Sequence, residues 1–71
     1  MNYSYFIGVE EAITEIVKRY PEGVTAEKIV KELLGQGISP LVVRKVLADM
    51  LRSGKLHKAP NKGISKMIFK I

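Results

Sequence analysis

Apolar residues recur at helical spacing in three stretches of the chain. Within residues 9–20, 25–34 and 39–53, apolar side chains follow one another three or four positions apart, so each stretch would bury one side. A proline or a glycine stands directly after each stretch, where such residues end helices. The pattern therefore predicts three amphipathic helices around a shared core.

The expected helix ends carry residues that suit them. Thr25 and Ser39 are good N-caps, and Pro40 fits the first helical position. Two glycines around Gln36 allow positive φ and a sharp change of direction between the second and third helices. Inward-facing positions are predicted for Val9, Ala12, Ile13, Ile16, Val17, Tyr20, Ile29, Val30, Leu33, Leu34, Val43, Val46, Leu47, Met50 and Leu51.

Residues 1–8 are predicted to form an N-terminal extension. Positions 3–7 alternate as in a short strand, whereas Ser4 would suit the cap of a longer helix that includes Gly8. Between the first and second helices, Val24 is a candidate for a very short strand.

The pattern changes from helical to alternating after the third helix. Residues 55–59 and 65–71 are predicted strands, and the PNKG segment at 60–63 supplies turn residues between them. The second strand would place three apolar residues on one face, namely Met67, Phe69 and Ile71. The sequence thus predicts an α+β domain with three helices and a C-terminal two-stranded β-hairpin over residues 55–71.

Length and composition narrow the class of protein. At 71 residues the chain forms one small domain, and its 46% hydrophobic content is adequate for a core. It contains no cysteine, which excludes disulfides and thiolate metal sites. No apolar run approaches the length of a membrane span, and no signal-peptide pattern opens the chain. We expect a soluble protein of the cytoplasm.

Charge is divided unevenly along the chain. Residues 1–37 contain four basic and six acidic residues, whereas residues 38–71 contain eight basic residues and one acid, Asp49. Such asymmetry is typical of a surface that binds a polyanion, and a solvated basic surface is the alternative. On the third predicted helix, the outward side comprises Leu41, Arg44, Lys45, Ala48, Asp49 and Arg52, with Val42 at its border.

The order helix, short strand, two helices and hairpin resembles the winged helix-turn-helix family of DNA-binding domains. The resemblance spans about residues 9–71 and rests on the sequences EGVTAEKIVKELL, ISPLVVRKVLADMLRSGKL and HKAPNKGISKMIFKI. Within the second of these, LADMLRSGKL is similar to the family's junction between its third helix and its wing. The small, lysine-rich, cysteine-free form is similar to compact regulators of archaea and of their viruses or plasmids.

This resemblance implies double-stranded DNA as the partner and transcriptional regulation as the function. It makes residues 39–53 a recognition helix in the major groove, with Arg44 at a guanine edge and Leu41 or Ala48 at a thymine methyl. It makes residues 55–71 a wing that mostly contacts phosphates. The implied DNA-binding residues are Thr25, Lys28, Ser39, Leu41, Arg44, Lys45, Ala48, Arg52, Lys58, Asn61, Lys62 and Lys66.

Some candidate residues have simpler interpretations. For Leu41, a partial core contact near the start of its helix is preferred over a base contact. Asp49 would repel phosphate unless it pairs with Lys45 or Arg52. His57, the only histidine, is expected to be an ordinary strand residue. No nucleophile–base pair, phosphate-cradling loop or metal cluster is visible in the sequence, so we expect no enzyme, no cofactor and no small-molecule ligand.

Two questions stay open at the level of sequence. Tyr3, Tyr5 and Phe6 either extend the core or, as we prefer, form a homodimer contact together with the first helix. The alternative function is a protein-interaction or dimerisation module without sequence-specific DNA binding, for which Leu41 and the same aromatic residues are candidates. Binding of RNA or single strands ranks last, because neither the third helix nor the PNKG segment offers an aromatic side chain for stacking.

Overall fold

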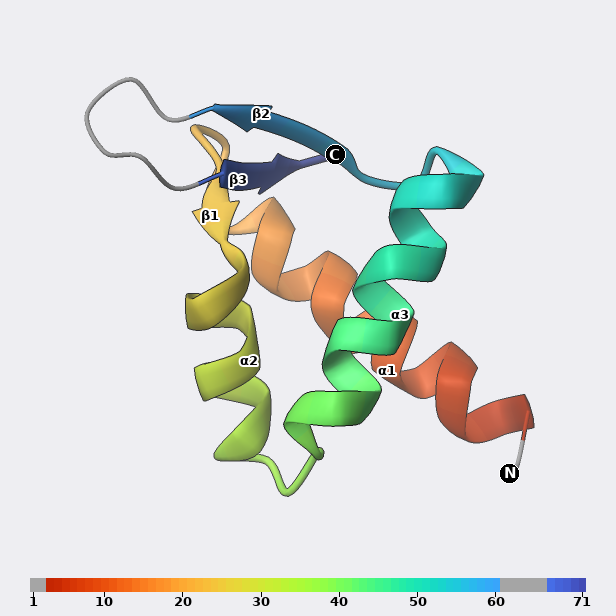
Figure 1. The fold of residues 1–71 in the computed structure, drawn as a ribbon. Coiled ribbons are helices and arrows are strands. Elements are labelled where there is room, and N and C mark those ends of the chain that lie inside the picture. The colour runs from red at the N-terminus through yellow and green to blue at the C-terminus, as the bar shows by residue number, and fades with distance from the viewer. Residues whose placement is uncertain (1–2, 61–66) are drawn as a thin grey trace.

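The computed structural model describes residues 3–60 and 67–71, in which three helices pack together and a three-stranded antiparallel sheet lies at one end of them (Figure 1). The elements are α1 (Tyr3–Lys18), β1 (Val24–Thr25), α2 (Ala26–Leu34), α3 (Pro40–Ser53), β2 (His57–Pro60) and β3 (Met67–Lys70). The predicted α+β class and its three helices are therefore confirmed. In the described part of the chain, no helix is long and apolar enough to cross a membrane.

Helix α1 begins at Tyr3, so residues 3–8 are helical, as in the longer-helix alternative, and the predicted N-terminal extension is wrong for them. The cause is tertiary packing: Phe6 is in helical phase with Val9, and it packs against the core although it is only partly buried. At its other end the helix stops at Lys18. The predicted last turn to Tyr20 continues as a tighter turn, with N–H groups donating to carbonyls three residues earlier.

Gly8 lies inside α1, where replacement by alanine is expected to stabilise the protein. An added Cβ at Gly8 would meet nothing within 4 Å, and the residue is exposed. Gly8→Ala should raise the free energy of unfolding by up to about 1 kcal/mol, because alanine loses less backbone entropy in a helix. Thermal denaturation followed by circular dichroism should show a melting temperature higher by roughly 4–8 °C. A lower melting temperature would mean that Gly8 is needed for a contact or a backbone geometry that the helix does not show.

The boundaries of α2 and α3 follow the predicted caps. The Thr25 hydroxyl accepts from the N–H of Lys28, and the Ser39 hydroxyl accepts from the N–H of Leu41. Both helices end in a Schellman motif whose left-handed residue is glycine: Gly37 has φ 83° and Gly54 has φ 81°. Of the two glycines in the GQG turn, only the second uses the positive φ that glycine allows, because Gly35 has φ −61°.

The sheet has three strands in the order β1-β3-β2, so the predicted two-stranded sheet is wrong in strand number. β3 pairs with β2 on one side and with β1 on the other, and both pairings are antiparallel. The very short strand predicted at Val24 is confirmed. The sequence had given this strand no partner, and in the structure it is the third strand of the sheet. Val24 lies opposite Phe69, and both side chains enter the core.

Apolar burial along β3 differs from the predicted alternation. Phe69 is buried as expected, but Ile68 on the opposite face is also buried, and Ile71 is 57% exposed. Ile68 is covered because the turn before β1 approaches it at Gly23, whose missing side chain leaves the necessary space. A purely alternating pattern would have left Ile68 in solvent.

Alanine at Gly23 is expected to destabilise the fold. Gly23 has φ 107°, and an ideal Cβ there would lie 2.5 Å from Ile68 Cδ1 and 3.1 Å from Ile68 Cβ. Rotation of the Ile68 side chain relieves the first contact but not the second. Gly23→Ala should therefore lower the free energy of unfolding by about 2–4 kcal/mol, from backbone strain and overpacking together.

Gly54→Ala is the matched control for this substitution. Gly54 also has positive φ, yet an added Cβ would meet nothing within 4 Å, so only the backbone strain of about 1–2 kcal/mol applies. Urea denaturation of both variants measures the difference. Equal losses would show that the Ile68 contact adds no destabilisation.

Candidate nucleic-acid interface

Helix α3 has one buried side and one exposed side, as its apolar spacing predicts. Its buried residues are Val43, Val46, Leu47 and Met50. On the border, Val42 and Leu51 are partly buried and pack against the core. Hydrophobic burial therefore fixes the rotation of α3 about its own axis, and this rotation decides which side chains point outward.

The outward side of α3 carries the cations. We define the basic face of α3 as Leu41, Arg44, Lys45, Ala48 and Arg52, all of which are exposed. In the part of the chain that the structure describes, no acidic side chain forms an ion pair with Arg44 or Lys45. Both cations are thus exposed to solvent, although Glu10 and Asp49 line the same hollow as Lys45.

Asp49 borders the basic face and forms an ion pair with Arg52, one helical turn later. This was one of the two partners expected for Asp49 from the sequence. The Asp49 side chain is 45% exposed and that of Arg52 is 75% exposed, so the pair is solvated and weak. Its local effect is to offset the charge of Arg52 and to leave the N-terminal half of α3 as the more positive half.

Leu41 is 81% exposed, so its preferred interpretation as a partial core contact is wrong. The reason is its place on the helix. Leu41 lies seven residues before Ala48, on the line most distant from the buried side of α3. At this end of the helix the core is filled instead by Ile38 and Val42.

Two other groups of predicted contact residues have structural roles. Ser39 caps α3, as described above. Thr25 caps α2, and the Lys28 ammonium lies over the Tyr20 ring, 5.0 Å from its centroid. Figure 1 shows the start of α2 beside the sheet, whereas α3 starts at the other end of the molecule. The structure therefore does not bring Thr25 and Lys28 next to the N-terminal half of α3.

Of the cations predicted for the hairpin, Lys58 lies in β2 and is exposed. It stands opposite Phe69 in the ladder. Asn61, Lys62 and Lys66 lie outside the described residues. His57 is an exposed residue of β2, which confirms its interpretation as an ordinary strand residue.

A hollow of about 220 Å³ lies between α1 and the border of the basic face. It is lined by Phe6, Glu10, Lys45, Val46 and Asp49. Beside it, the Lys55 ammonium binds the Glu10 carboxylate at 2.5 Å and so ties the end of α3 to α1. Sequence reasoning missed this arrangement, because it depends on how α1 crosses α3 and neither helix pattern contains that information.

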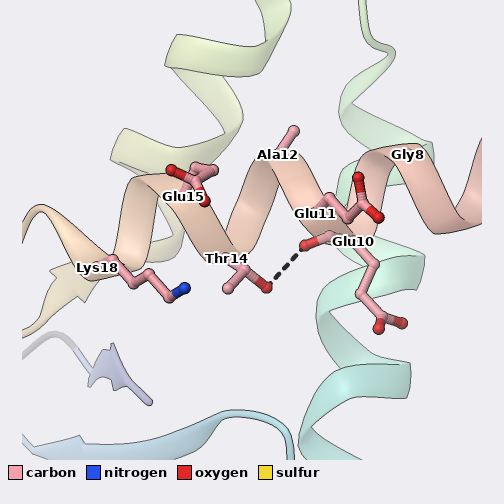
Figure 2. A pocket seen from close by; sticks show the side chains of 7 residues that line it. All are labelled: Gly8, Glu10, Glu11, Ala12, Thr14, Glu15 and Lys18. Carbon is pink, nitrogen blue, oxygen red and sulfur yellow. Dashed lines mark hydrogen bonds between the residues drawn. The ribbon is translucent and has the colours of Figure 1, made fainter.

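A second hollow, of about 430 Å³, follows the outer side of α1 (Figure 2). All of its lining residues belong to this one helix, so it has no opposing wall. Figure 2 shows Glu10 pointing to one side of the helix and Glu11 and Glu15 to the other, while the Thr14 hydroxyl donates to the Glu10 carbonyl at 2.9 Å. The carboxylates do not converge, and within residues 3–60 and 67–71 no group of three acids or histidines is placed to hold a metal ion.

The N-terminal aromatic residues divide between core and surface. Phe6 packs against the core, whereas Tyr5 is 40% exposed and meets the Phe6 ring edge-on, with centroids 6.4 Å apart. The side chain of Tyr3 lies outside those described. Ile7, on the same helical turn, is 47% exposed. The start of α1 therefore offers apolar surface on more than one side.

Comparison with protein-family models, with curated proteins and with solved structures gives no match. A function for this chain must therefore be inferred from its own surface. The feature that stands out is the basic face of α3, in which an exposed leucine, Leu41, precedes the exposed cations Arg44 and Lys45.

Proposed function

We propose that the chain is a duplex DNA-binding protein of the winged helix-turn-helix type and acts as a transcriptional regulator. The observation that carries this proposal is the basic face of α3. Arg44 and Lys45 are exposed, and they stand on a helix whose opposite side is held rigidly by the core. A helix of this kind fits the major groove of B-form DNA, where arginine and lysine bind guanine edges and phosphates.

The arrangement of the helices and strands supports this proposal. α2 and α3 are joined by a short glycine-containing turn, as in helix-turn-helix units. The antiparallel pair β2 and β3 follows α3 directly. Lys62, which lies outside the described residues, stays a predicted phosphate contact beside the groove. Lys58 would add a phosphate contact from β2.

Asp49 is expected to restrain DNA binding. Its carboxylate repels phosphate and holds Arg52 in an ion pair. Asp49→Asn removes the negative charge with little change in shape, so affinity for duplex DNA should rise about two- to fivefold, the range of one weak surface charge pair. Titration of a labelled duplex measures the change. Weaker binding would mean that Asp49 accepts a hydrogen bond from a base.

The proposal is tested by selection of bound sequences from a pool of random DNA duplexes. We expect recovery of duplexes that share a consensus, because base-edge contacts select sequence whereas phosphate contacts do not. A palindromic consensus would indicate two copies of the protein, since the symmetry of the site mirrors that of the dimer. Failure to retain any duplex at moderate salt would contradict the proposal.

A second candidate is a homodimer through the start of α1, favoured by the exposure of Tyr5 and Ile7. Such a dimer would place two recognition helices on one DNA site. Alternatively, the chain is a protein-interaction module whose function is dimerisation alone. Sedimentation analysis of the wild type and of Ile7→Lys separates these outcomes. A dimer that dissociates on substitution while DNA binding weakens supports a dimeric regulator. A dimer that binds no duplex supports the interaction module.

A further inference from the structure

Leu41 is the most exposed large apolar side chain in the described part of the chain, at 81%. Exposed leucines are common, but this one occupies a particular place. It stands at the N-terminal end of the basic face of α3, in line with the small residue Ala48, and Arg44 and Lys45 lie between them. The face therefore has an apolar ridge, formed by Leu41 and Ala48. Beside it stand Arg44 and Lys45, neither of which forms an ion pair with an acid among the described residues.

This combination restricts the surface that the ridge fits. An apolar protein surface would leave Arg44 and Lys45 buried without partners, which is unfavourable. A surface with phosphates alone would satisfy the cations but not the leucine. The major groove of DNA offers both, because thymine presents a C5 methyl group beside acceptor atoms of its neighbours. In A-form RNA the major groove is too narrow and deep for this contact, and uracil has no such methyl.

We infer that Leu41 is a specificity-determining residue that selects thymine by contact with its C5 methyl group. This inference rests on the proposed DNA binding and adds the identity of one base. The small side chain at Ala48 lets the middle of α3 approach the groove floor closely, which is the condition for Leu41 to reach a methyl group. Arg44 and Lys45 supply most of the affinity, and Leu41 supplies discrimination.

The test is a double-mutant cycle between protein and DNA. In the selected duplex each thymine is replaced, one at a time, by deoxyuridine, which lacks only the methyl group. Wild-type protein is expected to bind one of these duplexes about fourfold more weakly, the effect of one buried methyl group. Leu41→Ala should bind the parent duplex more weakly by at least that factor and should not respond to the same replacement.

Leu34→Ala is the matched control. Leu34, which was wrongly predicted to face inward, is 55% exposed at the end of α2 and does not belong to the basic face of α3. It should bind like the wild type and keep the response to deoxyuridine. Both leucines are exposed helix residues, so alanine is expected to preserve the fold, and circular dichroism verifies this.

Three results would overturn the inference. One is unchanged binding by Leu41→Ala, and another is an equal response of Leu41→Ala and wild type to every deoxyuridine. In both cases the proposed function stands, provided that charge reversal at Arg44 and Lys45 still weakens binding by at least about 100-fold. The third is that the protein binds no duplex and that Leu41 is buried instead in a complex with another protein. That result would overturn the proposed function as well.

Discussion

Reversal of charge at Arg44 and Lys45 together is expected to weaken binding to duplex DNA by at least about 100-fold. Each side chain is exposed on the basic face of α3, and neither forms an ion pair with an acid among the described residues. The double variant Arg44→Glu, Lys45→Glu therefore loses two attractive contacts and gains two carboxylates that repel phosphate. Fluorescence anisotropy with a labelled duplex at low salt measures the loss.

A control is needed because this variant also changes the net charge from its value of +5. Lys18→Glu with Lys31→Glu changes the net charge by the same amount, at exposed positions on α1 and α2. If affinity depends on the basic face, the control should bind far more tightly than the Arg44 and Lys45 variant. Equal losses would show that the overall charge attracts the polyanion and that α3 has no special role.

The second large effect is the dependence of binding on salt. With about five to seven phosphates engaged by α3 and the hairpin, the logarithm of affinity should fall against the logarithm of salt concentration with a slope of roughly −4.5 to −6. A fourfold increase in salt then weakens binding about 500- to 4,000-fold. The cause is the release of counterions that the protein's cations displace from the DNA.

The same titration distinguishes the contacts of individual side chains. Lys58→Ala should reduce the steepness of the slope by about one, because Lys58 is expected to neutralise one phosphate. Leu41→Ala should leave the slope unchanged, because a leucine displaces no counterion. A flat salt response of the wild type would contradict the assignment of α3 as a polyanion-binding helix.

The sequence predicted the parts of the fold that local chemistry decides. Thr25, Ser39 and Gly54 marked the ends of α2 and α3, because capping depends on residues within one turn. The start of α1 was missed for the opposite reason. The alternation of apolar residues before Gly8 resembled a strand, and only the packing of Phe6 on the core made the helical alternative better.

The sheet shows where local patterns stop being informative. Val24 pairs with Phe69, and the two residues belong to segments separated by α2 and α3. No short pattern records such a pairing, so the sequence predicted the strands without their order. The burial of Ile68 escaped prediction in the same way, because it depends on the approach of Gly23 from a distant turn.

The candidate site was predicted where it lies on a single helix. Helical periodicity placed Arg44, Lys45 and Arg52 on one side of α3. Spacing made Lys45 and Arg52 the candidate partners of Asp49, and the structure shows the pair with Arg52. The same periodicity placed Leu41 on the outward side, but the preferred partial core contact was wrong, because it depends on which neighbours fill the core at the start of the helix. The ion pair between Glu10 and Lys55 was missed because it joins α1 to the segment after α3, and no local pattern records such a contact.

The free edge of β2 affects how copies of the protein interact at high concentration. Among the described strands, β2 pairs only with β3, so its other edge has no strand beside it. That edge carries Lys58, a solvated cation, and ends in Pro60, which has no N–H to donate. Both features disfavour the addition of another strand. Copies of the protein at high concentration would thus resist joining their sheets edge to edge.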